Sequence, residues 1–600
     1  MKRNSPLQTE IPFEALDPER IRMESARKQA LEQGRTRLLV TGVMFALAFV
    51  VLGGRLVDLT RHGKDGAPTW RAMNRSKAEN PVVVRGDVRD RAGHILATSL
   101  PTQSLYVDSR EALKGGDPEE AASKLLSVLP DLNREHVLEK IKGGGRFDWL
   151  ARNLTPDQVW AVNSLGVPGF GFRREERRVY PYGPSFAHVI GYTDVDGRGI
   201  SGVERTFESR LGTQGEAIDL SIDMRVQAIL HEELVKTQAR FNALGAAGVV
   251  MDVNSGEIVA MVSLPDFDPN MPAGSLGESG FNRATKGVYE MGSTFKLFTT
   301  AMALDTGTVK LTDGYDASEP IHIARFTIND FHAKKRWLSV PEILVYSSNI
   351  GTAKMALDVG AKQQKEYLKR FGLLGASDVE LPEVGSPLYP ARWGDISTMT
   401  ISYGHGIAVS PLQLAAGVSA LINGGVMMPP TLMKRTDATV PRGEKVLKAK
   451  TSETMRSLMR LVVRTGTGKN ADVQGYLVGG KTGTAEKQVA GKYDKKALIS
   501  SFIGAFPMTN PRYVVLAVVD EPQGIKATYG YATGGWVAAP VVQGVIERMG
   551  PLYGMVPDGR GVEAEDAPDH PLHVPVSTGP KRTAMVGRPM AGGKVQHAAY

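Results

Sequence analysis

The sequence predicts a membrane-anchored α+β protein whose two main domains lie outside the membrane. Three observations predict this class: one uncharged apolar stretch near the N-terminus, strand patterns that cluster instead of alternating with helices, and a length of 600 residues, which exceeds one ordinary domain. With 42% hydrophobic and 23% charged residues, most of the chain is able to bury a large core. The absence of cysteine excludes disulfides and thiolate chemistry. The formal charge of +8 is modest for this length and typical of a solvated basic surface, and we expect no nucleic-acid partner.

Residues 38–59 are predicted to form a single transmembrane signal anchor. The stretch LLVTGVMFALAFVVLGG, residues 38–54, carries no charge and is long enough for about 25 Å of helix. Basic residues precede it at positions 27, 28, 35 and 37, so the positive-inside rule predicts that residues 1–37 form a cytoplasmic tail. A cleaved signal peptide is the alternative, but the polar segment before the apolar stretch is unusually long for one. Everything after residue 59 is therefore expected in the periplasm.

Residues 60–215 are predicted to form the first α+β domain, after a polar juxtamembrane linker at 60–80. Its apolar patterns return repeatedly to short strands, with helical periodicity between them. The expected elements are a strand–turn–strand unit at 82–98, helices at 119–129 and 155–165, and a strand-rich patch at 173–204.

Residues 216–550 are predicted to form the second domain, a mixed sheet flanked by helices. A strand, a turn at Asp223 and an amphipathic helix are expected first, and an Asn-Ser-Gly turn then indicates a hairpin. The expected elements are the strand and helix at 217–241, the hairpin at 246–265, helices through 295–421, strands at 475–482, 497–506 and 513–522, and a helix at 539–549. After Gly550 the composition shifts to Pro, Gly, His and Asp, which predicts a disordered tail at 551–600.

The stretch GYLVGGKTGT, residues 475–484, matches the phosphate-binding loop pattern of nucleotide hydrolases. Downstream, an apolar strand ends in Asp520 and Glu521, like the magnesium-binding strand of such proteins. Two observations oppose this hypothesis: the apolar strand YLV lies inside the supposed loop, and ATP is scarce outside the cytoplasm. We therefore expect no nucleotide and no metal, and we expect Lys481 to bind a different anion.

Ser293 and Lys296 in GSTFK lie three residues apart, on one face of a predicted helix. The helix N-terminus would stabilise a developing alkoxide, and the amine would take the hydroxyl proton. This S-x-x-K pair is a weak signal alone, since it recurs at Ser25 and Lys28 and an ordinary helix cap would explain Ser293.

Two further motifs strengthen the hypothesis of a nucleophilic serine. Ser347 and Asn349 precede another predicted helix, and Lys481 follows much later with Thr482 and Thr484. The second hydroxyl is able to relay a proton, the amide to hold a peptide backbone, and the cation with the two threonines to hold a carboxylate. The ordered set S-x-x-K, S-x-N, K-T-G is highly specific for acyl transfer by penicillin-binding proteins and serine β-lactamases.

The chain resembles the class B penicillin-binding proteins, and among them the septal peptidoglycan transpeptidases, over roughly residues 35–550. Besides the three motifs, the resemblance rests on RGDVRDRAGHILA, LSIDMRVQ, DVNSGEIVAM and RTGTGKNADVQGYLVGGKTGTAEK; it departs at Met291, where many relatives have Pro. It implies a non-catalytic pedestal domain of the dimerisation type at 60–215. It also implies a β-lactamase-like transpeptidase domain at 216–550, with a central antiparallel five-stranded sheet between helices.

The resemblance further implies a role for each site residue. Ser293 is expected to attack the penultimate D-Ala carbonyl of a pentapeptide stem, with Lys296 as its base and Ser347 as relay. The amides of Ser293 and Thr484 are expected to form the oxyanion hole. The predicted catalytic residues are Ser293, Lys296, Ser347 and Lys481, and the predicted substrate-binding residues are Asn349, Thr482, Gly483 and Thr484.

No cofactor is implied. The implied partners are peptidoglycan stem peptides, lipid II-derived nascent glycan, β-lactams as covalent inhibitors, an FtsW-type glycosyltransferase and the divisome proteins FtsQ, FtsL, FtsB and FtsN. The implied location is the division septum of the inner membrane. Three alternatives stay open: an elongation-specific relative, a penicillin-recognising sensor or β-lactamase, and a membrane-anchored scaffold with a dead site.

Overall fold

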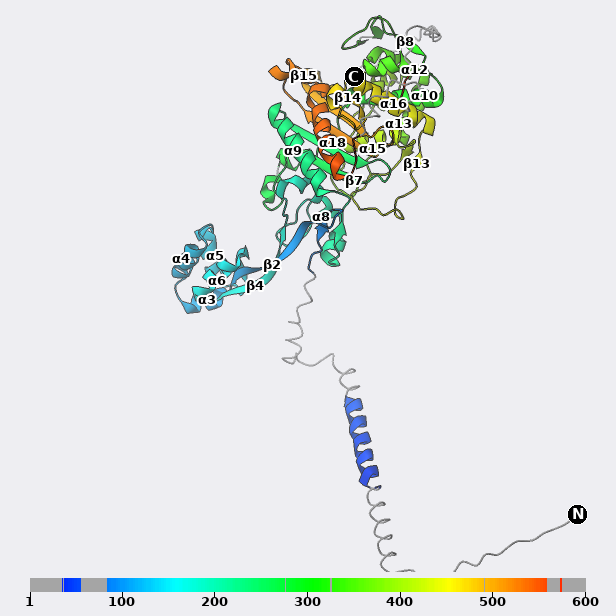
Figure 1. The fold of residues 1–600 in the computed structure, drawn as a ribbon. Coiled ribbons are helices and arrows are strands. Elements are labelled where there is room, and N and C mark those ends of the chain that lie inside the picture. Colours follow the sequence, from blue (N-terminus) through cyan, green and yellow to red (C-terminus); the bar gives the residue numbers. More distant parts are fainter. Residues whose placement is uncertain are drawn as a thin grey trace, which may run out of the picture. The chain divides into compact units, whose positions relative to one another are not determined.

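The computed structural model describes residue 35 and residues 37–55, 84–275, 277–323, 326–489, 492–557 and 572–574. The chain divides into two units, Met1–Val82 and Val83–Tyr600 (Figure 1). In the first unit the helix Arg37–Arg55, with 19 residues and a mean hydropathy of 2.0, is long and apolar enough to cross a membrane. It overlaps the predicted anchor. The predicted linker at 60–80 and most of the predicted tail at 551–600 lie outside the described residues.

The second unit begins with a sheet built on one long strand, β2 (Ile95–Val107). Its second half is flanked by β3 (Asp148–Leu154) and β4 (Phe170–Val179), both antiparallel to it. β1 (Val88–Arg89) pairs with the first residues of β2 and, in parallel, with β5 (Ile218–Asp219). The strand–turn–strand prediction at 82–98 is therefore confirmed.

Four helices pack with β2 and β3 around a small apolar core centred on Leu105, Val107 and Leu125. Two of them begin where the sequence predicts. Asp117 caps the first turn of one, with a proline following the cap, and Thr155 forms a capping box with Gln158 at the other. The helices are α3 (Ser109–Gly115), α4 (Pro118–Val128), α5 (Arg134–Lys142) and α6 (Pro156–Ser164).

The prediction of a strand-rich patch at 173–204 is wrong beyond β4. The chain turns at Gly183, which has a φ of +52°, and then forms α7 (Ala187–Ile190) and α8 (Gly202–Thr206). Gly191, with a φ of +75°, allows these two helices to meet, since a Cβ there would lie 1.9 Å from the carbonyl oxygen of Ser201.

A buried ion-pair network joins α8 to the base of the first sheet. The fully buried carboxylate of Glu204 accepts a hydrogen bond of 2.7 Å from Arg85 and another of 2.7 Å from Arg178 on β4. Arg85 also pairs with Glu208 at 2.8 Å, and the Glu208 side chain is 41% exposed. The network ties three separate segments together in the protein interior.

The central sheet of the second unit has the order β14-β15-β16-β6-β7 and is antiparallel throughout. This confirms the predicted five-stranded antiparallel sheet and the predicted hairpin, which turns at Asn254–Gly256 between β6 and β7. The strands are β6 (Gly245–Asp252), β7 (Ile258–Leu264), β14 (Gly479–Val489), β15 (Lys492–Phe506) and β16 (Tyr513–Asp520).

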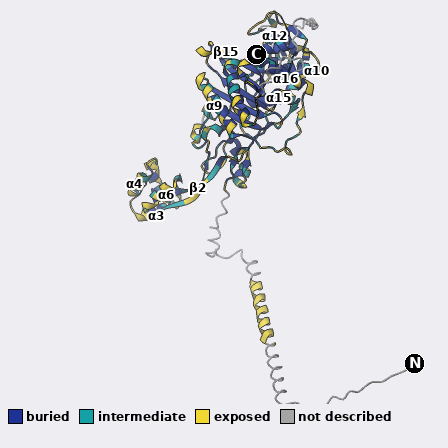
Figure 2. Ribbon diagram, viewed as in Figure 1, coloured by how far each residue is buried: buried dark blue, intermediate teal, exposed yellow. Residues whose placement is uncertain are grey.

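Alternate residues of this sheet enter two different cores, so helices cover both faces. Leu516 joins the core shared with α10, α15 and α16, whereas its neighbour Val515 joins the core shared with α9 and α18. Figure 2 shows the resulting buried interior, in contrast to the exposed anchor helix. The five helices are α9 (Met224–Arg240), α10 (Lys296–Thr306), α15 (Pro411–Ile422), α16 (Ala449–Thr465) and α18 (Ala539–Leu552).

The predicted helical region contains short strands as well as helices. Its further helices are α11 (Val340–Val345), α12 (Asn349–Val359), α13 (Ala361–Arg370) and α14 (Asp395–Ser402). Its strands are β8 (Gly314–Asp316), β9 (Ile321–Ile323), β10 (Phe326–Ile328) and β11 (Trp337–Ser339). Elsewhere lie β12 (Val426–Met427), β13 (Glu444–Lys445) and the short helix α17 (Gly534–Val537).

The predicted strand at 475–482 begins later than expected. β14 starts at Gly479, and the apolar YLV segment before it is not a strand. Leu477 has a φ of +46°, a left-handed conformation that a strand does not accommodate. β14 lies at the edge of the sheet, which leaves one side of its backbone without a neighbouring strand among the described residues.

Candidate active site

The first motif lies where a 3-10 helix, Gly292–Phe295, runs into α10. Ser293 is partly exposed on this turn, whereas Lys296 is fully buried. Gly292 has a φ of +53°, and a Cβ there would lie 2.6 Å from the carbonyl oxygen of Thr484. The glycine therefore allows the turn that carries Ser293 to lie directly against β14.

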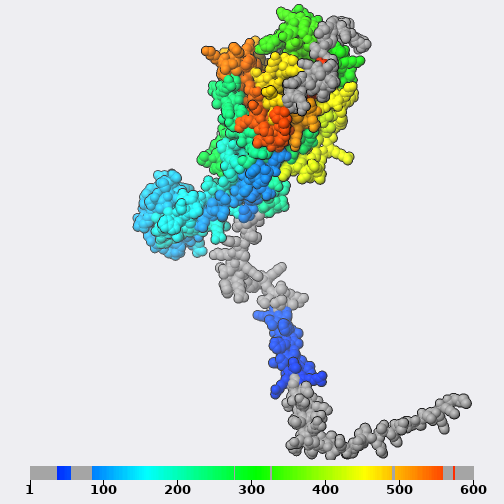
Figure 3. All heavy atoms as spheres, viewed as in Figure 1, coloured from blue at the N-terminus to red at the C-terminus, as the bar shows by residue number. Residues whose placement is uncertain are grey.

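The second motif places a hydroxyl between two buried ammonium groups. The Oγ of Ser347 lies 3.1 Å from the Nζ of Lys296 and 3.0 Å from the Nζ of Lys481. Lys296 also donates to the backbone oxygen of Ser347 and, at 2.7 Å, to Oδ1 of Asn349. Segments that are distant in sequence thus meet at one point, and in Figure 3 the green residues of the 300–350 region adjoin the yellow-to-orange residues of the 480–500 region.

The third motif presents hydroxyl groups along the edge strand. Besides Ser347, the Lys481 ammonium donates to the Oγ1 of Thr482 at 3.2 Å. That hydroxyl also shares a hydrogen bond of 2.8 Å with Thr467, and the Oγ1 of Thr484 accepts one of 3.1 Å from the backbone N–H of Gly534. A cation and two hydroxyls therefore lie together on β14, a suitable arrangement for a carboxylate.

Burial lowers the pKa of both Lys296 and Lys481. It lowers the pKa of Lys481 to about 7. For Lys296, burial comes first and repulsion from Lys481 second, and together they hold its pKa well below the ordinary value, while the negative charge of Asp330 opposes them. A lowered pKa favours the neutral amine, the form of lysine that is able to act as a base.

We expect acylation by a carboxylate-bearing β-lactam to weaken above about pH 7. The Lys481 pKa is lowered, so its positive charge is present below about 7 and is lost as the pH rises through that value. The second-order rate constant of acylation, measured by stopped flow between pH 5 and 10, should therefore show a falling limb near 7, because it reports the free enzyme. A methyl ester of the same β-lactam, which has no carboxylate, should lack this limb; an identical limb for the ester would contradict the prediction.

Gly483 lies where β14 crosses the turn that carries the nucleophile candidate. A Cβ at this position would lie 2.3 Å from the Oγ of Ser501 and 2.5 Å from the carbonyl oxygen of Met291. Neither distance is tolerated between non-bonded atoms, so the strand or the turn would have to shift.

We expect Gly483→Ala to lower the acylation rate by about 100-fold, because a displacement of about 1 Å is enough for such a loss. The measurement is single-turnover acylation by a chromogenic cephalosporin. Gly375→Ala is the matched control, since a Cβ there meets no atom within 4 Å. Wild-type rates in both variants would show that the close approach at Gly483 is not needed.

Three residues that contact the site were not predicted from the sequence. Asp330, in the loop after β10, accepts hydrogen bonds from the Ser348 hydroxyl and from the backbone of Ile350. The carbonyl oxygen of Asn329 accepts one from the amide of Asn349, and Thr467 bonds Thr482. The only signal in the sequence was the string RTGTGK, which contains Thr467 and belongs to the resemblance; the loop carried none.

The structure also contradicts the hypothesis that residues 475–484 form a phosphate-binding loop. Lys481 is followed by a strand and not by the helix that such a loop opens. Asp520 and Glu521, which imitate a magnesium-binding strand, instead pair with Lys487 at 2.7 and 2.6 Å. The acidic groups are neutralised by a lysine of the same sheet.

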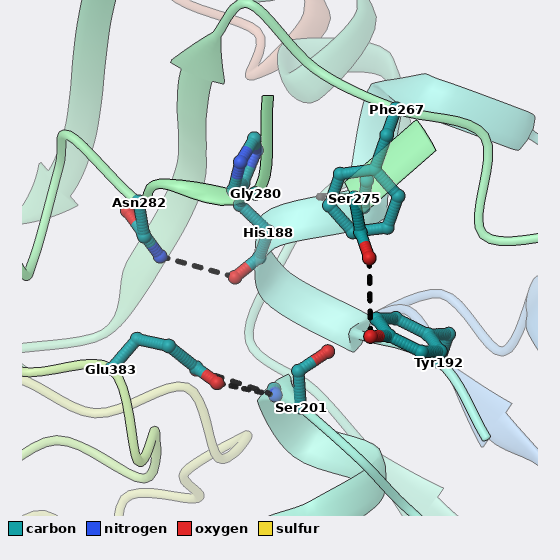
Figure 4. A pocket seen from close by; sticks show the side chains of 10 residues that line it. His188, Tyr192, Ser201, Phe267, Ser275, Gly280, Asn282 and Glu383 are labelled. Atoms are coloured by element: carbon teal, nitrogen blue, oxygen red, sulfur yellow. Dashed lines mark hydrogen bonds between the residues drawn. The ribbon is translucent and has the colours of Figure 1, made fainter. Parts of the chain in front are cut away.

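A separate cavity of about 90 Å³ lies between α7, α8 and the segment after β7 (Figure 4). Its polar groups pair largely with one another: Ser275 with Tyr192 at 3.1 Å and Asn282 with the backbone oxygen of His188 at 3.2 Å. Glu383 accepts from the backbone of α8, and burial raises the pKa of its carboxyl. None of the eight predicted site residues lines this cavity.

Comparison with protein families gives two matches in sequence order. Residues 81–236 match the penicillin-binding protein dimerisation domain, and residues 246–547 match the penicillin-binding protein transpeptidase domain. The second match contains every predicted site residue.

Curated relatives align with most of the chain. The chain is 40% identical over 550 residues to the probable peptidoglycan D,D-transpeptidase FtsI of Caulobacter vibrioides, covering 89% of this chain and 91% of that protein. It is 33% identical over 549 residues to the peptidoglycan D,D-transpeptidase FtsI of Escherichia coli K12, covering 86% and 92%.

Solved structures share the fold. Penicillin-binding protein 3 of Mycobacterium tuberculosis, complexed with aztreonam, superposes with a TM-score of 0.62 at 23% identity, covering 80% of this chain and 97% of that one. The transpeptidase domain of Burkholderia pseudomallei penicillin-binding protein 3 superposes with a TM-score of 0.51 at 34% identity, covering 56% and 97%.

Proposed function

Because the chain belongs to the class B penicillin-binding proteins, we propose that Ser293, Lys296, Ser347 and Lys481 carry out the transpeptidase reaction of that family. The protein is a peptidoglycan D,D-transpeptidase that cross-links stem peptides during septal cell-wall synthesis. One observation supports the assignment of residues: the Ser347 hydroxyl bridges two buried lysine amines, and one of these lysines, Lys296, follows the partly exposed Ser293 by three residues.

Acylation begins with the neutral amine of Lys296, which takes the proton of the Ser293 hydroxyl as Oγ bonds to the penultimate D-Ala carbonyl carbon. The carbonyl oxygen becomes an oxyanion, held by the backbone N–H groups of Ser293 and Thr484. When the intermediate collapses, the peptide C–N bond breaks and the terminal D-Ala leaves as an amine. The proton that this amine needs returns from Lys296 through the Ser347 hydroxyl.

Binding of the donor stem uses the edge strand. Lys481, Thr482 and Thr484 hold the terminal carboxylate, and Gly483 keeps the strand close enough to the nucleophile for this contact. Asn349 uses its oxygen for Lys296 and one N–H for Asn329, which leaves the other N–H for the donor peptide backbone.

Deacylation forms the cross-link. The amine of a neighbouring stem attacks the ester carbon, and the new peptide C–N bond forms. The bond between the acyl carbon and the Oγ of Ser293 then breaks. One proton of the amine goes back to the Ser293 hydroxyl through the same relay, so the enzyme returns to its starting state. A β-lactam mimics the donor and stays bound to Ser293.

The test uses the full chain in detergent with a D-Ala-D-Ala donor and an acceptor amine. Mass spectrometry should find an acyl adduct on the peptide that contains Ser293, with free D-Ala and the amide product formed in equal amounts. An adduct on a different residue would refute the assignment of Ser293. Free D-Ala without an amide product, at saturating acceptor, would favour a hydrolase.

We also propose the membrane topology, the site of action and the partners. The arginines at positions 35 and 37 support a cytoplasmic N-terminus with the rest of the chain in the periplasm, divided near residue 215 into pedestal and transpeptidase domains. By analogy with the FtsI relatives, an FtsW-type glycosyltransferase and FtsQ, FtsL, FtsB and FtsN are the proposed partners at the septum. A fluorescent fusion should gather at mid-cell, and depletion should give filaments; rounded cells would instead indicate a lateral-wall role.

A further inference from the structure

The loop after β10 holds the start of α12 from outside. One oxygen of the Asp330 carboxylate accepts a hydrogen bond of 2.7 Å from the Ser348 hydroxyl, and the other accepts one of 3.0 Å from the backbone N–H of Ile350. The neighbouring carbonyl oxygen of Asn329 accepts one of 2.8 Å from Asn349. Two consecutive loop residues therefore contact the three residues that follow Ser347.

These contacts are more than an ordinary helix cap. The Ser348 hydroxyl already accepts the N–H of Gly351 at 3.0 Å, which caps α12 without help from the loop. The carboxylate is an additional tether, and it acts next to Ser347, whose φ of +59° is unusual for a residue with a side chain. Holding the residues that directly follow this turn helps to fix the hydroxyl that the two lysines share.

The charge of the same carboxylate acts on Lys296. This ammonium is completely buried on α10 and faces Lys481 on β14, a second positive charge. His405, in the loop after α14, also lies within the field of Lys296, and burial lowers the pKa of this imidazole, so that it is neutral at physiological pH. Among the described residues, Asp330 supplies the negative charge that acts on Lys296 and opposes its deprotonation.

We propose that Asp330 is a positioning residue for acylation: its two hydrogen bonds hold the Ser348–Ile350 segment next to Ser347, and its negative charge favours the protonated form of Lys296. The proposal rests on the proposed function, in which neutral Lys296 takes the proton of Ser293. It assigns two separable effects to one side chain, which different substitutions are able to isolate.

Asp330→Asn isolates the charge, because the amide keeps the shape and at least one acceptor. With the negative charge gone, Lys296 loses its proton at a lower pH. The rising limb of the acylation rate against pH should therefore move down by about half to one pH unit, the size expected for one nearby charge. Acylation of the full chain in detergent by a chromogenic cephalosporin, followed by stopped flow, gives this profile.

Ser348→Ala tests the tether, because it removes the hydrogen bond to Asp330, together with the cap bond from Gly351, and keeps the charge. It should lower the rate about tenfold at every pH, the equivalent of one lost hydrogen bond to a charged group, and leave the limb in place. Asp378→Asn, which removes an exposed carboxylate, should match the wild type in both respects.

The outcomes separate the proposal from the proposed function. An unmoved limb in Asp330→Asn, or a moved limb in Ser348→Ala, would overturn the role of the charge. A wild-type rate in Ser348→Ala would overturn the tether. If Asp330→Asn does not unfold cooperatively on heating, the pH–rate profile of Ser348→Ala still tests the tether. Failure of the wild type to be acylated at Ser293 would instead refute the proposed function.

Discussion

Ser293→Ala is expected to abolish covalent labelling of the chain by a fluorescent penicillin. The acyl bond forms on the Ser293 oxygen, so removing that atom should lower the acylation rate by at least about 10⁴-fold. We expect Lys296 and Lys481 to stay in place, because both bond to the Ser347 hydroxyl and not to Ser293. The measurement is in-gel fluorescence of membranes that contain the 64.8 kDa chain.

The matched control for this experiment is Ser318→Ala. Ser318 is partly exposed, and its hydroxyl bonds locally, to Asp316 at 2.6 Å. It should label like the wild type. Retained labelling of Ser293→Ala would end the assignment of the nucleophile, whereas loss of labelling in both variants would point to a general folding defect.

Glu204→Gln is expected to lower the free energy of unfolding by about 3–5 kcal/mol, the usual range when one partner of a buried ion pair is removed. The substitution keeps the shape of the side chain but leaves the guanidinium groups of Arg85 and Arg178, which are 5% and 8% exposed, without their shared negative charge. The thermal unfolding temperature of the purified chain, compared at one fixed scan rate, should fall by several degrees.

Glu208→Gln tests whether burial causes that effect. Its carboxylate pairs with the same Arg85 at 2.8 Å, but its side chain is 41% exposed, so solvent screens the pair and the loss should stay below about 1 kcal/mol. Equal shifts in the two variants would contradict the explanation. None of the hydrogen bonds given for Arg85, Arg178, Glu204 and Glu208 goes to the Ser293 turn, so penicillin labelling below the melting temperature should survive in both variants.

The sequence indicates which residues are candidates for the site, but not how they are arranged. Ser293 and Lys296 share a helix, so their proximity follows from spacing alone. The approach of Lys481 does not, because it depends on β14 lying at the edge of the sheet, directly against the glycine turn. From the sequence alone, only the resemblance to a known family indicated that the three motifs lie together.

Two kinds of feature were beyond sequence reasoning. Asp330 lies in a polar loop without a recognisable motif. Its proposed role rests on hydrogen bonds to Ser348 and Ile350, which are not its neighbours in sequence. The strand patch at 173–204 was overestimated, because alternating polar and apolar residues continue past β4 while Gly183 and Gly191 turn the chain into helices. Glycine conformations of this kind depend on tertiary contacts, which a pattern of hydrophobicity does not contain.

The left-handed backbone of Ser347 has a consequence for protein engineering. A non-glycine residue in this conformation stores about 1–3 kcal/mol of strain. A glycine at position 347 would relieve this strain, but it would also remove the hydroxyl that we propose as the relay. Mutant libraries selected for thermal stability should keep residue 347 unchanged, because at this position stability and acylation favour different residues.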